Sequence, residues 1–159
     1  MPSDLTPAPL ARPLDQPRIE LKTDVIRVGD IIYCRSKRYR DSLGLPQEPG
    51  LVIEIKRANY KILYASDKRA WIPRETLVRG ASTDSPTFLQ TLNFLLRRVD
   101  AHECEIVSAE GTHRVSARID AIDHTTVDEL RAFLAEKFIS LLVVPEGMAF
   151  MQVEIRFKA

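Results

Sequence analysis

The sequence predicts an α+β protein in which a small β domain at residues 25–79 precedes an α-β-β-α-β-β domain with an antiparallel sheet at residues 87–159. Three observations predict this division. Short β-type runs bounded by turn residues fill the first segment, and two stretches with apolar residues at helical spacing occur in the second. Between them, residues 80–86 (GASTDSP) have the small and polar composition of a linker.

Residues 1–24 are expected to form a disordered, Pro-rich tail. Five of the ten prolines fall in the first 18 residues, which is too close a spacing for a helix. The tail is a solubilising leader or, alternatively, a Pro-rich ligand for a partner groove. It lacks the basic start and the apolar stretch of a secretion signal, and no run in the chain has the length of a membrane span. A cytoplasmic location without membrane contact is therefore expected.

The first domain is predicted from alternating apolar residues between turns. Leu51, Ile53 and Ile55 alternate with more polar neighbours, which is the repeat of a strand with one buried face. Pro73 is tolerated at the start of one helical turn. The predicted elements are a strand at 28–35, a long polar loop at 36–50, strands at 51–56, 60–65 and 69–72, a helical turn at 73–76 and a short strand at 77–79.

This order of elements resembles that of the SH3-like barrels. The segments VGDIIYCR, GLVIEIK, YKILYA and RAWIPRETLV look like the Tudor, Agenet and KOW group of that superfamily, in which a Gly-Asp start and a Trp-containing fourth strand recur. The resemblance covers residues 25–79, and no family is recognised for residues 86–159. It implies a small SH3-like β-barrel with a binding role, without naming the ligand.

The second domain is predicted to begin with a helix at residues 87–99. A second helix is expected from Thr126, whose hydroxyl and Glu129 have the spacing of a capping box, to about Phe138. Two β-hairpins complete the domain. Their strands are expected at 102–109, 112–119, 140–144 and 149–158, and the alternation is clearest in the last of these.

Charge is divided unequally between the two domains. Residues 25–79 contain twelve Lys or Arg against six Asp or Glu, and residues 80–159 contain eight against twelve. In an SH3-like barrel, the long first loop and the Trp-bearing strand border one groove. The sequence therefore predicts a basic and aromatic binding patch, with the alternative that Trp71 completes a small core. The predicted partner-binding residues are Arg35, Lys37, Arg38, Tyr39, Arg40, Lys68, Arg69 and Trp71.

No catalytic or metal-binding set is evident from the spacing of reactive residues. Cys34 and Cys104 fall in different predicted domains, and a buried thiol is the expected state of each. His102 and His113 are able to face each other across the first hairpin, but solvated positions are the simpler interpretation. Phosphate-binding motifs such as GxxxxGK[ST] and GxGxxG are absent from the sequence, and no cofactor is expected.

Three functions remain open from the sequence. The first is a non-catalytic interaction or adaptor protein whose basic barrel docks an acidic protein surface. The second is a DNA- or RNA-binding protein that uses the same patch. The third is an enzyme subunit with a site in the α+β domain. The edge of the C-terminal hairpin is in addition a possible contact for a homo-oligomer.

Overall fold

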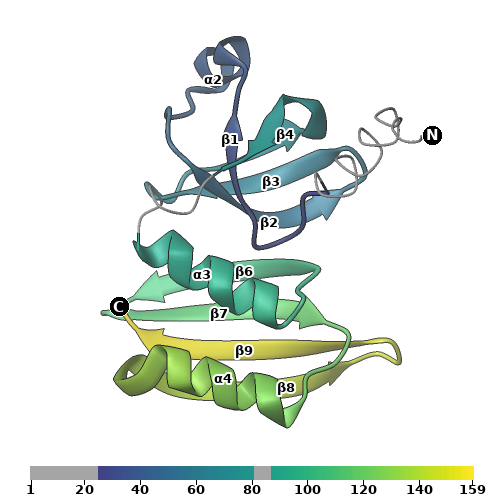
Figure 1. Ribbon diagram of the computed structural model, residues 1–159, viewed down its shortest axis with the longest axis vertical. Helices are drawn as coiled ribbons and strands as arrows, with labels where there is room; N and C mark the ends of the chain where they lie inside the picture. The colour runs from purple at the N-terminus through teal and green to yellow at the C-terminus, as the bar shows by residue number, and fades with distance from the viewer. Residues whose placement is uncertain (1–24, 81–86) are drawn as a thin grey trace, which may run out of the picture.

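The computed structural model describes residues 25–80 and 87–159 (Figure 1). All strands in these ranges belong to one sheet, in which neighbouring strands are antiparallel. Seven strands follow the order β4-β3-β2-β6-β7-β9-β8, and β1 pairs with β2 and β5. The α+β prediction is confirmed. The expected tail at 1–24 and most of the expected linker at 80–86 lie outside the described residues.

Five strands form the first half of the described chain, in the pairing order β5-β1-β2-β3-β4. The prediction that β2 buries one face only is wrong, because Leu51, Val52 and Ile53 are all buried. This strand lies inside the sheet and is covered by α3, and Ile53 interrupts its register with β3. The bounds are β1 Ile31–Cys34, β2 Gly50–Lys56, β3 Asn59–Tyr64, β4 Arg69–Pro73, the 3₁₀ turn η2 Arg74–Thr76 and β5 Leu77–Arg79.

The long polar loop predicted after β1 contains a helix, α2 (Lys37–Leu43). Ser36 caps its start by accepting a hydrogen bond from the backbone N–H of Tyr39 at 3.2 Å. Gly44 ends the helix in the left-handed conformation, with φ of 64°. The N–H of Leu45 then bonds the carbonyl of Arg40 at 2.8 Å, which is the Schellman arrangement. These two caps explain why a seven-residue helix with no buried residue forms here.

The second half has the predicted α-β-β-α-β-β order. Val115, Ala117 and Ile119 share the buried face of β7, and Val153 and Ile155 share that of β9, as the alternation predicts. Among the described strands, β8 pairs with β9 alone and is an edge of the sheet. The bounds are α3 Thr87–Arg98, β6 Glu103–Ala109, β7 Thr112–Ile119, α4 His124–Leu134, the 3₁₀ turn η4 Ala135–Lys137, β8 Phe138–Glu146 and β9 Phe150–Lys158.

The predicted capping box of the second helix is wrong. The cap of α4 is Asp123, whose carboxylate accepts a hydrogen bond from the backbone N–H of Thr126 at 2.7 Å. That bond holds the pKa of Asp123 below its usual range. The helix also ends earlier than expected, at Leu134, because Ala135 adopts φ of 50° and interrupts the helical backbone. Phe138 therefore begins β8 instead of ending the helix.

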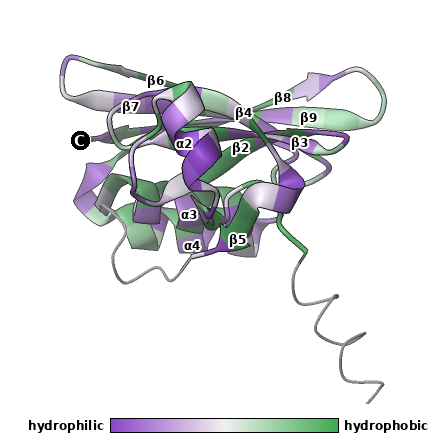
Figure 2. Cartoon of the chain, turned by 90° about the horizontal axis from the view of Figure 1, so that it is seen from above, coloured by the Kyte–Doolittle hydropathy of each residue, from purple (hydrophilic) through white to green (hydrophobic). Residues whose placement is uncertain are grey.

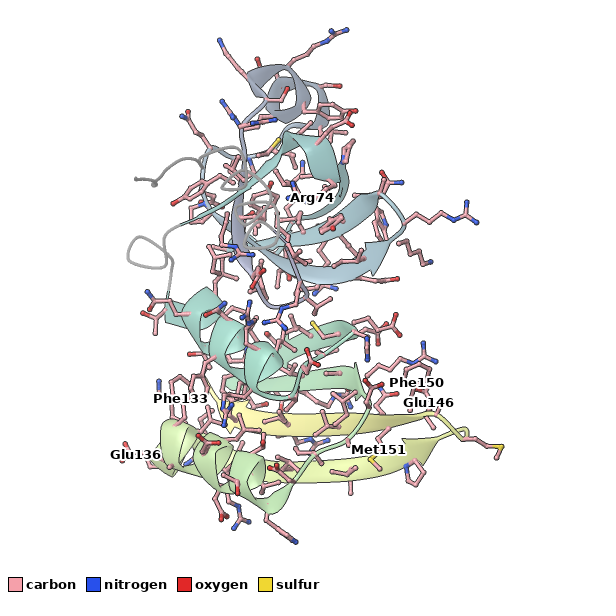
Figure 3. All side chains as sticks on the ribbon, turned by 45° about the vertical axis from the view of Figure 1, so that its right-hand side comes forward. Arg74, Phe133, Glu136, Glu146, Phe150 and Met151 are labelled. Carbon is pink, nitrogen blue, oxygen red and sulfur yellow. The ribbon has the colours of Figure 1, made fainter. Side chains whose placement is uncertain are left out.

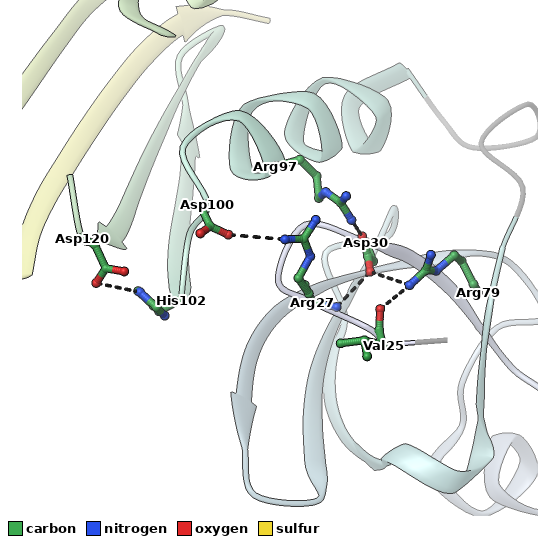
Figure 4. Close-up of polar contacts among 8 residues, drawn as sticks. All are labelled: Val25, Arg27, Asp30, Arg79, Arg97, Asp100, His102 and Asp120. Carbon is green, nitrogen blue, oxygen red and sulfur yellow. Dashed lines mark hydrogen bonds and ion pairs between the residues drawn. The ribbon is translucent and has the colours of Figure 1, made fainter. Parts of the chain in front are cut away.

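The two halves are joined through the sheet and through a buried carboxylate. Strand β2 pairs with β6. At the turn before β1, the Asp30 side chain accepts hydrogen bonds from the Arg97 guanidinium of α3 and, at 2.9 Å, from the backbone N–H of Arg27 (Figure 4). The Arg79 guanidinium of β5 lies 3.6 Å from the same carboxylate. Asp30 thus connects β1, β5 and α3.

Gly29 allows the turn before β1 to approach α3 closely. Its φ is 95°, and a Cβ atom placed on it would lie 2.9 Å from Cβ of Leu96. Its carbonyl accepts a hydrogen bond from the Asn93 side chain of α3. A residue with a side chain would have to push the helix away here, so the turn at Gly29 and Asp30, which the sequence places at the start of the first strand, also positions the second half.

Helices α3 and α4 cover one face of the sheet and leave the opposite face without either helix (Figure 2). The buried apolar residues of both halves form one continuous core. No helix within residues 25–80 and 87–159 has both the length and the apolar composition needed to cross a membrane.

Candidate functional site

Four of the eight predicted binding residues are exposed on α2 or directly before it. Lys37, Arg38 and Tyr39 are exposed on the helix, and Arg35 is exposed just before it. Lys68 joins them from the turn between β3 and β4, because its ammonium lies next to Gly44 at the end of α2. We call these five residues the α2 surface. An open hollow of about 560 Å³ lies beside Arg38 and Tyr39, where Ser36, Ser42 and Thr76 also line it.

The α2 surface is basic because its cations have no carboxylate partners within it. No ion pair joins Arg35, Lys37, Arg38 or Lys68 to a carboxylate of the described residues. The Arg35 guanidinium instead donates a hydrogen bond to the carbonyl of Glu75 at 3.0 Å, which orients its charge. An exposed group of cations without internal neutralisation attracts an anionic partner.

Two predicted binding residues serve the fold instead of the α2 surface. Arg40 turns inward and donates to the carbonyl of Cys34 at 2.6 Å, which fixes α2 against β1. Arg69 lies on β4 and donates to the carbonyl of Ile106 on β6 at 3.0 Å, and it also pairs with Asp67 at 3.3 Å. Both guanidiniums are occupied by contacts within the chain.

Trp71 lies apart from the α2 surface, on the exposed side of β4. The alternative prediction that it completes a small core is not what the structure shows, because its side chain is 39% exposed. The ammonium groups of Lys56 and Lys61 lie 5.8 and 5.9 Å from its ring centroid, within cation–π range. We call these three residues the Trp71 cluster. Lys61 is the direct cross-strand neighbour of Trp71.

Sequence reasoning missed Lys56 and Lys61. The available signal was the alternation in β3 and β4, where Ile62 and Ile72 are fully buried and their neighbours Lys61 and Trp71 point to the other side. Beyond Lys61, the same cross-strand row continues through Glu54 to Glu103 on β6. The row is therefore basic at the Trp71 end and acidic where the two halves meet.

The histidines and cysteines do not converge. The His102 ring contacts the Asp120 carboxylate at 3.0 Å, while His113 lies at the other end of the hairpin and contacts the Ser108 hydroxyl at 2.6 Å. Both cysteines are buried and free, and burial raises the pKa of Cys104 to about 12. Within residues 25–80 and 87–159 no group of three or more His, Cys, Asp or Glu is arranged to hold a metal ion.

Comparisons with known proteins add no relative. The chain matches no protein-family model, and searches of curated proteins and of solved structures find no significant match.

Proposed function

We propose that this protein is a non-catalytic interaction protein in which the basic α2 surface docks an acidic surface of a partner protein. The main support for the proposal is the structure of helix α2. The helix buries no residue, yet it is capped at both ends and presents Lys37, Arg38 and Tyr39 outward. A helix that contributes nothing to the core and exposes cations together with an aromatic ring is typical of a recognition element.

The resemblance to SH3-like barrels supports a binding role for residues 25–79. Their strands pair in the order β5-β1-β2-β3-β4, and the 3₁₀ turn η2 separates β4 from β5. This succession of strands and the single helical turn support the proposal, although β2 also continues the sheet into the second half through β6. We propose that these residues form an SH3-like unit and that α2 is an insertion in its long first loop.

A nucleic-acid ligand is the second candidate, and the Trp71 cluster favours it. An exposed indole flanked by two ammonium groups suits a stacked base with its adjacent phosphates. The cluster is small, however, and the cross-strand row beside it continues into Glu54 and Glu103. Lys56 of the cluster pairs with Glu54 at 3.8 Å, so part of its charge is neutralised within the chain, whereas no cation of the α2 surface pairs with a carboxylate of the described residues. We therefore favour the acidic protein.

One pair of matched variants separates the two ligands. Lys37→Gln with Arg38→Gln removes two of the four cations of the α2 surface, and Lys56→Gln with Lys61→Gln removes both cations of the Trp71 cluster, with the same change in net charge. Binding of fluorescein-labelled poly-L-glutamate and of a single-stranded oligothymidylate is measured by anisotropy at low salt. The α2 variant is expected to bind poly-L-glutamate roughly tenfold more weakly, and the cluster variant as tightly as the unmodified protein.

The converse pattern would support the nucleic-acid ligand. In that case the oligothymidylate binds the unmodified protein, its binding weakens in the cluster variant, and it quenches the fluorescence of Trp71, which is the single tryptophan of the chain. If poly-L-glutamate binds the α2 variant and the unmodified protein equally well, the proposed function is wrong.

A further inference from the structure

A cavity of about 480 Å³ lies where the start of α3 meets the end of α4, far in sequence from the α2 surface. The side chains of Phe133 and Glu136 mark this end of α4 and η4 in Figure 3. The volume falls within the range of about 300–1,000 Å³ that is usual for small-molecule sites. We call it the α3–α4 cavity, and its main lining residues are Phe88, His113, Phe133, Glu136, Lys137 and Lys158.

Aromatic rings form the walls of the cavity. The imidazole of His113 lies between two phenyl rings, with centroids 4.3 Å from Phe88 and 5.2 Å from Phe157. Phe133 stacks on Phe94 at 3.9 Å and remains 44% exposed, so its ring is available to a ligand. Such walls suit a flat apolar body, because ring faces and edges gain from stacked and tilted contacts.

The charged side chains at the rim are two ammonium groups, of Lys137 and Lys158, and one carboxylate, of Glu136. Ala159, the last residue of the sequence, lines the cavity beside them. Among the described residues, neither ammonium forms an ion pair with a carboxylate. Burial and the charge of Lys137 lower the pKa of His113, which therefore stays neutral and adds an uncharged hydrogen-bonding edge. An anionic head group is the complement of this rim.

The backbone of the cavity is strained at Ala135. This residue has φ of 50° and ψ of −122°, a conformation that residues with a Cβ rarely adopt. The strain places Glu136 and Lys137 in a 3₁₀ turn over the cavity instead of in a further turn of α4. Strain of this kind is concentrated at ligand sites and switch regions.

We propose that the α3–α4 cavity binds a small aromatic carboxylate, with its ring among Phe88, His113 and Phe133 and its carboxylate at Lys137. The site is separate from the α2 surface and does not depend on the proposed docking function. Aromatic walls, an unneutralised cationic rim and a strained turn that carries Lys137 support it together.

The test uses two probes of the same shape, 2-naphthoate and the uncharged 2-naphthamide, added to the full chain labelled with ¹⁵N. The carboxylate is expected to bind saturably and to shift the amide signals of residues 87–91, 135–137 and 157–158. The naphthamide should bind about fivefold more weakly, the difference that one partly exposed charge contact contributes.

Variants then assign the charge contact. Lys137→Gln is expected to weaken 2-naphthoate about fivefold and to leave 2-naphthamide unchanged, whereas Arg57→Gln, which removes an exposed cation outside every proposed site, should change neither. Thr91→Phe fills the cavity from α3 and should abolish both interactions in a protein whose melting curve remains cooperative. The proposal is wrong if the carboxylate does not saturate, if both probes bind equally well, or if the shifted signals lie outside the cavity.

Discussion

Asp30 and Arg97, which are 67 residues apart in the sequence, form an ion pair between the turn before β1 and helix α3, with the carboxylate buried and the guanidinium partly exposed. The carboxylate is 3% exposed and also receives the N–H of Arg27 and the guanidinium of Arg79. It therefore ties the basic first half of the chain to the acidic second half. This contact, with the pairing of β2 and β6, makes one sheet and one core out of segments of opposite charge.

Asp30→Ala is expected to lower the free energy of unfolding by about 2–3 kcal/mol, measured by urea denaturation. The loss stays below that of a fully buried pair because Arg79 and Arg97 are partly exposed and regain water. Asp100→Asn removes an exposed carboxylate 3.7 Å from Arg27 and keeps a side chain that tolerates the φ of 52° at this residue, so it is the control, with a change within about 0.5 kcal/mol. Equal effects of the two variants would show that Asp30 does not join the halves.

Gly29→Ala tests the close approach of the turn to α3. The substitution places a Cβ 2.9 Å from that of Leu96 in a backbone with φ of 95°. Gly147→Ala is the control, because Gly147 also has a positive φ, of 68°, and a Cβ atom added there would have nothing within 4 Å. The control should lower the free energy of unfolding by about 1 kcal/mol through the backbone conformation alone, and Gly29→Ala should lower it clearly more. Thermal unfolding of both variants measures the difference, and similar melting temperatures would contradict the close packing.

The stability of the protein is expected to decrease as the pH falls below about 6.5, through His113. Its pKa in the folded state is lowered by burial, so the unfolded chain binds the proton first. The free energy of unfolding is thus unaffected above the unfolded pKa and falls until the lower folded pKa is reached. Denaturation of His113→Gln between pH 7 and pH 5 should show a smaller decrease; an identical pH profile would exclude this contribution.

The thiols of Cys34 and Cys104 should react with Ellman's reagent only when the chain opens. Both are buried, and the pKa of Cys104, at about 12, leaves almost no thiolate at neutral pH. Release of the chromophore is expected to be slow in native buffer and rapid in denaturant. Rapid release from the native protein, retained in Cys34→Ser, would show that Cys104 is accessible.

The sequence predicted those helices and strands whose apolar residues repeat regularly because one face of the element is buried in the core. The alternation in β9 was readable because Val153, Ile155 and Phe157 all face one core. Helix α2 was missed because it buries no residue and so has no apolar period, and only Ser36 and Gly44 marked its ends. Likewise, the apolar pattern predicts that α4 continues to about Phe138. The positive φ of Ala135 ends the helix earlier, and an alanine in the sequence gives no sign of such a backbone conformation.

The candidate site was predictable only in part, because sequence patterns show which residues are neighbours along the chain but not which strands and helices meet in space. Lys37, Arg38 and Tyr39 are neighbours in the sequence and remain neighbours in α2. The separation of Trp71 from them, and its approach to Lys56 and Lys61, depend on how the strands pair in space. The α3–α4 cavity depends on the packing of two helices and two strand ends, which no local pattern records.

If the α2 surface is the docking face for an acidic protein partner, an acidic polymer should perturb this surface before any other part of the protein. The most direct measurement is a map of amide chemical-shift changes in the ¹⁵N-labelled full chain when poly-L-glutamate is added at low ionic strength. Docking on the α2 surface should concentrate the shifts at residues 35–44 and at Lys68 and leave the indole signal of Trp71 unchanged. Shifts centred on Trp71, Lys56 and Lys61, or no shifts at all, would contradict it.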